Sequence, residues 1–342
     1  MTATTEAGSE QVVAGPWFED LVRGELLGAP AITLTAGHAV AHQALIGDRL
    51  RLPLDATLSA RVLGGEGGSL AHPALVWDVS IGQSTGLTQR VIANLFYRGL
   101  VFRRFPLIGD TLRTTTEVVA LRRNRKRPGR AATGLAALRV RTTDQEGRAV
   151  LDFWRCAMLP LRDAEMPEGP ADDLDAIPTD LDLGSLGSGI KAWDLAAYSD
   201  GLESSRPPVR AGDRFTVAAG DVVSGAPELA RLSLNIAAAH HDATGPLGRR
   251  LVYGGHTIGL AAAQLTRALP DLLTIVAWQS CDHLNPVYEG DTLFSKIEVE
   301  RVDPLSDGGS LLHLRSRVRA VRAGAADESV DVLDWRLVGV TI

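Results

Sequence analysis

The chain has 342 residues, of which 45% are hydrophobic and 22% are charged, and its net charge is −6 at neutral pH. This length allows two domains of ordinary size, and the composition is typical of a soluble globular protein. The acidic balance provides no basic face for a nucleic acid, and no apolar run approaches the ~20 residues that cross a bilayer, so we expect neither a nucleic-acid partner nor a membrane segment.

Compartment is indicated by the cysteines and the first residues. Cys156 and Cys281 are too few for a disulfide framework, which favours a reducing environment. The opening MTATTEAGSEQ lacks the charged start and apolar stretch of a secretory signal. We therefore expect a cytoplasmic protein.

The first half opens with residues 17–55 and continues into LAHPALVWDVSIG from Leu70, a small and apolar stretch of helical length. We expect this helix to be buried. His38 and His42 are four residues apart on a short helix, a spacing that suits a metal ion, but the sequence offers no evident acidic partner. We therefore interpret them as surface or core histidines.

Strand-like runs follow at 112–121, 134–142 and 150–159. Residues 163–200 are rich in Asp, Gly, Pro and Ser and contain few apolar anchors, which predicts a connector that runs over the surface. Within it, we expect the stretch from Trp193 to Tyr198 to dock locally.

The second half has the same order of elements. Its opening segment, 211–242, ends in LNIAAAHHD and precedes LVYGGHTIGLAAAQLTRAL from Leu251. Apolar residues at helical spacing, with small residues between them, predict a helix that is buried nearly all round and that Pro270 ends. Runs at 273–280, 293–302, 310–321 and 330–340 then have the pattern of half-buried antiparallel strands.

The two halves share sequence at an offset of 181 residues. GDTL at 109–112 recurs at 290–293, Glu117-Val118 recurs as Glu298-Val299, and Trp154-Arg155 recurs as Trp335-Arg336. Self-similarity at a fixed offset indicates a duplicated structural unit. A buried helix followed by an antiparallel meander that wraps it is the hot-dog arrangement. We therefore predict an α+β protein with a double hot-dog fold: an N-terminal domain (1–162), a linker (163–200) and a C-terminal domain (201–342).

The loop before the second helix resembles that of the MaoC-like R-specific enoyl-CoA hydratases, which carry D-x-N-P-x-H-x-D followed by a turn like V-H-G-M. Asn235 falls on the catalytic Asp of that family, His240 on its catalytic His and Asp242 on the final Asp. Ala237 and Ala238 replace the Asn-Pro pair. The resemblance covers nearly the whole chain, in two copies, and the motif match is partial.

The resemblance implies syn addition of water across a 2-enoyl-CoA, or the reverse dehydration, without a metal or organic cofactor. His240 would carry the proton, because an Asn at 235 can orient water but cannot accept a proton. Asp242 would assist or cap a turn.

Backbone N–H groups at the helix start would polarise the thioester carbonyl. The candidates for this part of the site are Tyr253, Gly254, Gly255 and His256. Glycine permits a close approach of the backbone to the substrate. The His256 side chain is either a participant or a plain helix-start residue, and His283 is expected to be structural.

The first half departs further from the family motif. GDRLRLPLD at 47–55 aligns with the same loop, with an acid at Asp48 and Pro53 where the His should stand. We interpret Asp48 as a turn residue. The resemblance implies that this degenerate half holds the CoA tail or the acyl chain.

The segment from Ile92 to Phe105 resembles the mesaconyl-CoA hydratase branch of the family. Tyr97, Arg98 and Arg103 would suit a CoA phosphate or a substrate carboxylate, although an ordinary strand with exposed arginines fits equally well. This segment favours a branched or dicarboxylic enoyl-CoA.

Other functions stay open. A thioesterase would need an acid such as Asp48 or Asp242 to activate water, and a non-catalytic acyl-CoA-binding protein would explain why Asp is missing at 235 and His at 53. The sequence contains no G-x-S-x-G elbow, no phosphate-binding glycine loop and no zinc-type Cys/His spacing. Because two fused hot dogs already form a pseudo-dimer, we expect a monomer or a homodimer of the chain.

Overall fold

The computed structural model describes residues 11–65, 68–163, 165, 168–178, 180–181, 186–199, 207–245, 248–306 and 308–342. Residues 1–10, most of the segment on which we predicted the absence of a signal peptide, lie outside them, as does the predicted boundary at 200–201. The helices are α1 (Ala36–Ile46), α2 (Arg51–Leu54), α3 (Ala56–Val62), α4 (Pro73–Gln83), α5 (Leu195–Ser199), α6 (Ala226–Leu232), α7 (Ala238–His241) and α8 (Gly254–Ala268), with the 3-10 turns η1 (Phe18–Asp20), η2 (Ser84–Thr88), η3 (Leu174–Ala176) and η5 (Ser188–Ile190). The strands are β1 (Leu26–Gly28), β2 (Ile32–Thr33), β3 (Ala93–Phe102), β4 (Thr111–Arg123), β5 (Thr133–Thr143), β6 (Ala149–Pro160), β7 (Arg214–Thr216), β8 (Asp221–Val222), β9 (Leu272–His283), β10 (Thr292–Pro304), β11 (Ser310–Arg322) and β12 (Ala325–Thr341).

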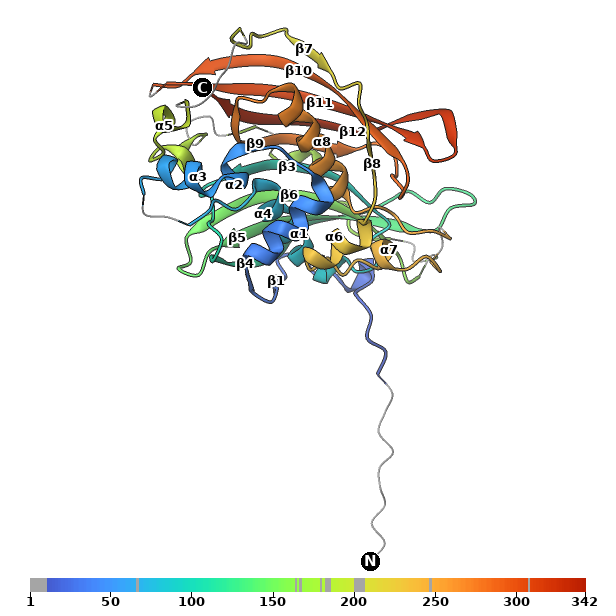
Figure 1. Cartoon of the computed structure of the whole chain (residues 1–342). Helices are drawn as coiled ribbons and strands as arrows, with labels where there is room; N and C mark the ends of the chain where they lie inside the picture. The colour runs from blue at the N-terminus through green and yellow to red at the C-terminus, as the bar shows by residue number, and fades with distance from the viewer. Residues whose placement is uncertain are drawn as a thin grey trace, which may run out of the picture.

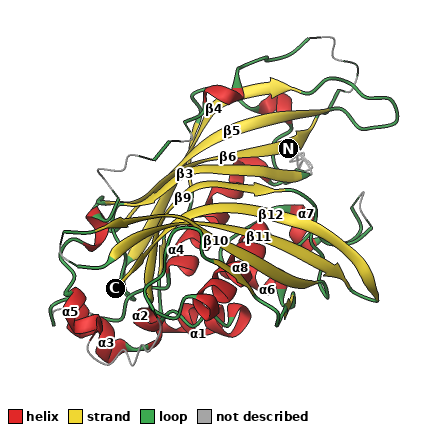
Figure 2. Ribbon diagram, turned by 90° about the horizontal axis from the view of Figure 1, so that it is seen from above, coloured by secondary structure: helices red, strands yellow, loops and turns green. Residues whose placement is uncertain are grey.

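All twelve strands of the described residues belong to one antiparallel sheet, in the order β1-β4-β5-β6-β3-β9-β12-β11-β10-β7, with β2 beside β4 and β8 beside β10. The halves join where β3 pairs with β9. Figure 2 shows the long strands side by side, with α1, α4 and α8 on one face. The sheet therefore wraps two central helices, as the sequence predicted for an α+β protein.

The central helices α4 and α8 lie against each other and against the sheet (Figure 1). Every residue of α4 is buried, and α8 is buried over most of its length, from Gly255 to Thr266. Trp77 of α4 packs edge-on against Trp278 of β9 at 4.8 Å, and Trp278 packs against Trp335 of β12 at 5.5 Å between ring centroids. These fully buried indoles fill the space where the two halves meet.

The duplication extends to hydrogen bonds and register. Asp110 accepts from the N–H of Leu107, and Asp291, 181 residues later, accepts from the N–H of Tyr288. At the same offset, Trp278 is the counterpart of Tyr97 and Cys281 is the counterpart of Leu100. The β3–β9 pairs Tyr97–Cys281 and Leu100–Trp278 are therefore equivalent to each other. The offset of 181 therefore holds through the first strand of each half.

On the last strand of each half the offset is 182 instead. Arg139 pairs with Asp152, and its counterpart Arg315 pairs with Asp334. Trp154-Arg155 and Trp335-Arg336 therefore occupy different positions in the two halves of the fold, and that part of the predicted repeat was wrong. Trp154 is half-buried, whereas Trp335 is fully buried in the core.

The connector between the halves is more firmly anchored than its composition predicts. Six apolar side chains among its described residues are buried: Leu174, Ile177, Leu186, Ile190, Leu195 and Tyr198. The Tyr198 hydroxyl donates to the Leu272 carbonyl at 3.1 Å, and Trp193 packs on Phe105, so the predicted docking of the stretch from Trp193 to Tyr198 is confirmed. The prediction that few apolar residues hold the connector to the domains was wrong, because apolar residues that are widely spaced among polar ones are each buried in the core.

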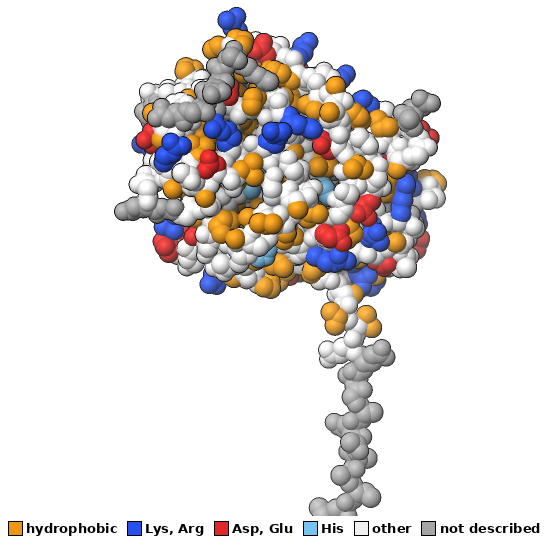
Figure 3. All heavy atoms as spheres, viewed as in Figure 1, with side chains coloured by type: hydrophobic (Ala, Val, Ile, Leu, Met, Phe, Trp, Pro, Cys, Tyr) orange, Lys and Arg blue, Asp and Glu red, His pale blue; other side chains and the backbone are white. Residues whose placement is uncertain are grey.

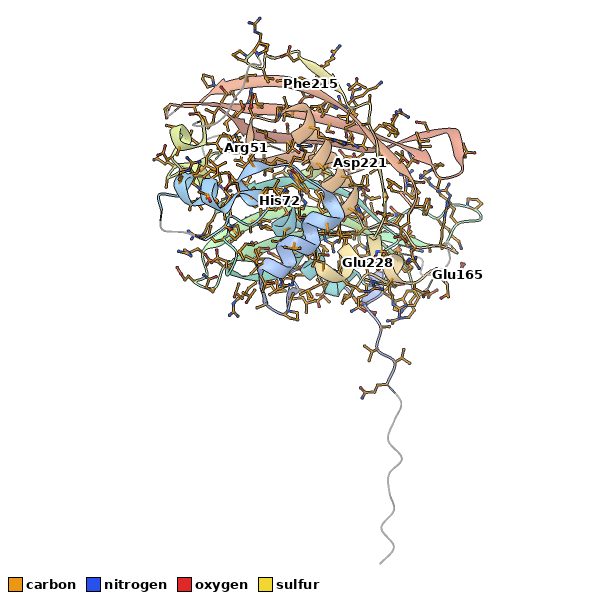
Figure 4. The ribbon with its side chains drawn as sticks, viewed as in Figure 1. Arg51, His72, Glu165, Phe215, Asp221 and Glu228 are labelled. Carbon is orange, nitrogen blue, oxygen red and sulfur yellow. The ribbon has the colours of Figure 1, made fainter. Side chains whose placement is uncertain are left out.

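Polar contacts hold the second half's opening segment to its central helix. Asp221 of β8 lies beside α8 (Figure 4), where its carboxylate accepts from Gln264 and forms an ion pair with Arg267. On the face drawn in Figure 3, basic and acidic side chains are scattered rather than gathered by sign. Within the described residues, the helices are all too short or too polar to cross a membrane.

Candidate active site

A cavity of about 320 Å³ lies between the two halves. The first half contributes the end of α4, η2, the start of β3 and one residue of β6. The second half contributes α7, the start of α8 and the segment from His283 to Tyr288. Its lining is mostly apolar, with a few polar groups, which is the usual character of a small-molecule site.

His240 lines this cavity from α7 and is only 9% exposed. Its Nδ1 lies 2.8 Å from the Leu251 carbonyl, which can only accept, so Nδ1 carries the hydrogen and Nε2 carries the lone pair. Burial lowers the pKa of His240 to about 4, and the neighbouring His241 and Arg155 also lower it. The ring is therefore neutral at pH 7, in the form that accepts a proton.

Asn235 lines the same cavity from the turn between α6 and α7, and it is buried. Its Oδ1 accepts from the Ala237 N–H at 3.0 Å, and its own N–H donates to the Ala230 carbonyl at 2.8 Å. With the oxygen of the side chain occupied locally, the Nδ2 amide is the donor left for a ligand.

The first half contains the counterpart of this turn, as the sequence alignment predicted. Asp48 accepts from Leu50 two residues on, as Asn235 accepts from Ala237, and the four-residue α2 corresponds to α7. Pro53 therefore lies where His240 lies in the second half. Asp48 is a buried turn residue, and its carboxylate also accepts from Thr266 and lies 3.5 Å from His72.

Leu234, directly before Asn235, has φ of 59° and is the only non-glycine residue with positive φ in the described chain. Its counterpart in the first half is Gly47, with φ of 67°. A left-handed conformation costs an L-residue roughly 1–2 kcal/mol, so local strain is stored beside the polar group of the site.

We expect Leu234→Val to lower the free energy of unfolding by about 1 kcal/mol or more, because a β-branched residue tolerates this conformation poorly. Leu234→Gly should cost less than Leu234→Val, since glycine adopts it freely. Urea unfolding of both variants measures the difference. If the valine variant were the more stable of the two, the backbone at 234 would not be strained.

The start of α8 contains four predicted site residues, and the structure brings two of them to the cavity. Tyr253 and Gly254 line it, and the Gly254 N–H, on the first residue of the helix, has no intrahelical partner. A Cβ on Gly254 would lie 2.6 Å from His283 Nε2, so only glycine allows this approach.

The other two predicted residues of the helix start, Gly255 and His256, are buried away from the cavity. A Cβ on Gly255 would meet Asp78 and the Tyr253 ring, so this glycine serves helix packing. The His256 N–H donates to the Tyr253 carbonyl, and the ring is fully buried. The prediction that these two N–H groups face the substrate is not supported, because the residues of α8 that line the cavity are Gly254 and Thr257.

Two further predicted site residues lie outside the cavity lining. Arg98 forms an ion pair with Asp282 at 2.6 Å on the outer side of β3, although its neighbour Tyr97 does line the cavity. Asp242 is exposed at the end of α7, where it accepts from the N–H and hydroxyl of Thr244. Asp242 therefore stabilises the turn that follows α7, and its carboxylate does not line the cavity with His240.

Sequence reasoning missed two basic residues that line the cavity. His283, expected to be structural, has its buried Nε2 without a hydrogen-bond partner in the described chain, and burial lowers its pKa to about 4. Arg155 reaches the cavity from β6. Alternation along β6 is the signal that would have found Arg155, because Phe153, Arg155 and Ala157 all lie on the buried face.

The connector fills the first half's counterpart of the cavity. At the offset of 181, Val91 of the cavity corresponds to Leu272, which contacts Tyr198 of the connector. Pro286 of the cavity corresponds to Phe105, which contacts Trp193 of the connector. Cζ of Arg51 on α2 (labelled in Figure 4) lies 5.4 Å from the centroid of the Tyr198 ring. The cavity that stays open is therefore the one that contains His240.

Helix α1 contains the two histidines that are spaced as metal ligands, His38 and His42. His42 Nε2 lies 3.1 Å from Asp78 Oδ2, whereas His38 Nδ1 accepts from the N–H of Thr35, the N-cap of α1. No set of three potential ligands for a metal ion occurs in the part of the chain that the structure describes. His42 is thus a paired core histidine.

Comparisons with known proteins agree on one family. The chain is 31% identical over 297 residues to β-methylmalyl-CoA dehydratase of Chloroflexus aurantiacus, covering 83% of this chain and 82% of the relative. It is 30% identical over 319 residues to mesaconyl-CoA hydratase of Cereibacter sphaeroides, covering 88% of each. No protein-family model matches the chain.

Solved structures give the same fold. A conserved Mycobacterium tuberculosis protein with a double hot-dog fold matches with a TM-score of 0.88 and 51% identity, covering 96% of this chain and 99% of that one. A MaoC-domain dehydratase from Chloroflexus aurantiacus matches with a TM-score of 0.84 and 24% identity, covering 97% and 99%. The predicted double hot-dog fold is confirmed.

Proposed function

The chain belongs to the MaoC-like, double hot-dog family of CoA-ester hydratases and dehydratases, and from that membership we propose that it reversibly adds water across the double bond of a branched or dicarboxylic 2-enoyl-CoA. The observation that carries the proposal is His240: a neutral imidazole, fixed through Nδ1, in one cavity with the glycine start of α8. The expected monomer or homodimer and the cytoplasmic location stay predictions.

In the proposed mechanism, His240 Nε2 accepts a proton from water that the Asn235 amide orients. The water oxygen bonds to C3 as the C2–C3 double bond shifts electrons to the thioester oxygen. The imidazolium then returns a proton to C2, so one O–H bond breaks while one C–O and one C–H bond form. Dehydration follows the same steps in reverse.

The charge that develops on the thioester oxygen needs donors that are already in place. The N–H of Gly254, at the positive end of α8, is the proposed donor. Because His283 lies close above Gly254, we assign it the positioning of the thioester rather than the proton transfer.

A thioesterase is the alternative that the cavity favours least. It would need a carboxylate to activate water at the thioester carbon, and none of the described residues that line the cavity is Asp or Glu. The two acids considered for that role, Asp48 and Asp242, lie elsewhere.

The proposed function is tested with a panel of enoyl-CoA and 3-hydroxyacyl-CoA esters that includes mesaconyl-CoA and crotonyl-CoA. We expect the absorbance of the conjugated thioester to fall with at least one enoyl ester and to rise with the matching hydroxy ester, with no thiol released. Release of free CoA thiol would instead identify a thioesterase. Tight binding of CoA esters without turnover of any would identify a non-catalytic protein.

A further inference from the structure

Arg155 occupies a position on β6 that the fold otherwise gives to an apolar side chain. It lies opposite Tyr97 on β3, and its counterpart in the second half, which lies opposite Trp278 on β9, is Leu337. Leu337 is 1% exposed and Arg155 is 3% exposed. The same buried site of the duplicated sheet thus holds a leucine in one half and an arginine in the other.

The guanidinium of Arg155 has no carboxylate partner in the described chain. Its Nη2 donates to the Ser84 carbonyl at 3.1 Å and to Thr88 Oγ1 at 2.6 Å, both uncharged, and its buried Nε has no partner there. By contrast, Arg139 on the adjoining β5 and Arg315 on β11 of the second half each pair with an aspartate. A buried, uncompensated cation is costly, and burial accordingly lowers the pKa of Arg155.

The cavity around Arg155 is electrostatically one-sided. Of the described residues that line it, Arg155 is the only Arg or Lys, and no Asp or Glu accompanies it. The ligand that compensates this charge is therefore an anion. A deeply buried guanidinium suits a small carboxylate, because the CoA phosphates are large, strongly hydrated and favour the protein surface.

We propose that Arg155 binds the free carboxylate of a dicarboxylic acyl-CoA and thereby selects this class over monocarboxylic esters. The inference rests on the proposed function and names the substrate class of the same site. The thioester would lie at Gly254 and the distal carboxylate at Arg155, with C2 and C3 of the chain near His240. The guanidinium held by Ser84 and Thr88 is already oriented, so little side-chain freedom is lost on binding.

The test compares Arg155→Gln with wild type on mesaconyl-CoA and on crotonyl-CoA, which lacks the second carboxylate. We expect kcat/KM for mesaconyl-CoA to fall about 100-fold or more, mainly through KM, because a buried charged hydrogen bond is lost. For crotonyl-CoA we expect a change of less than about three-fold. Arg336→Gln is the matched control, because Arg336 lies on the outer face of β12, paired with Glu300.

Equal losses on both substrates would overturn the inference and assign Arg155 to structure alone. A second measurement does not depend on a variant that folds: inhibition of wild type by succinyl-CoA and butyryl-CoA. We expect succinyl-CoA to bind at least about ten-fold more tightly, and equal affinities would also overturn the proposal. If no enoyl ester is hydrated but succinyl-CoA still binds selectively, the proposed function fails while the carboxylate site stands.

Discussion

Replacing His240 with Ala is expected to lower kcat for hydration by about three orders of magnitude, because general acid–base catalysis by one side chain contributes typically 10²–10⁴-fold. The cavity contains no carboxylate in its described lining that could take over the proton, and Asn235 cannot accept one. KM should change little, since the acyl chain and thioester contact other groups. Steady-state kinetics on the best substrate of the panel measures both parameters.

The fold should survive the His240→Ala change. The lost hydrogen bond to Leu251 and the small void together should lower the free energy of unfolding by about 1–3 kcal/mol. His313→Ala is the matched control, because His313 pairs with Asp303 outside the cavity lining and should leave kcat unchanged. Near-normal turnover by His240→Ala would contradict the mechanism but not the fold.

Much of this architecture could be predicted from sequence, because the fold depends on periodic burial. The helix that starts near Gly254 and the strands around Leu112 and Leu293 follow from spacing alone. Asn235 and His240, which the loop pattern selected, both line one cavity. The connector could not be predicted in this way. Apart from the stretch from Trp193 to Tyr198, its single buried residues, such as Leu174 and Ile190, have no period and depend on where the two halves leave space.

The site was harder to predict than the fold, because its chemistry depends on directions that a motif does not encode. Asp242 matched a family position, yet its carboxylate turns back to Thr244. The repeated Trp-Arg dipeptide aligns Arg155 with Arg336, whose side chain lies on the outer face of β12. The structural counterpart of Arg155 is Leu337, one residue further on, and a shift of one residue along a strand reverses which side chain faces inward. His283 lies far from the motif in sequence and reaches the cavity only through the end of β9.

Replacing Gly82 with Ala is expected to damage stability and activity together. Gly82 lies in α4, where an added Cβ would stand 1.9 Å from the Ser233 carbonyl oxygen and 2.7 Å from its carbon. These are backbone atoms, so no side-chain rotation relieves the clash. Forcing an extra methyl group into a packed interior typically costs 1–3 kcal/mol, and we expect a loss of about 3 kcal/mol in the free energy of unfolding.

The effect on activity follows from where the displaced backbone leads. Ser233 precedes the strained Leu234 and then Asn235, so pushing Ser233 away from α4 shifts the amide that is proposed to orient water. A displacement of about 1 Å can cost 10²-fold in rate, so we expect kcat to fall at least ten-fold in the molecules that remain folded.

Gly37→Ala separates this mechanism from a general cost of alanine. Its Cβ would meet only Thr35 Oγ1 at 3.5 Å, an ordinary contact within the first turn of α1, so stability should be unchanged or slightly higher. Urea unfolding and kinetics of both variants are compared with wild type. A Gly82→Ala protein with wild-type stability and turnover would mean that α4 does not fix the turn that carries Asn235, and the site would then owe its geometry to α7 and α8 alone.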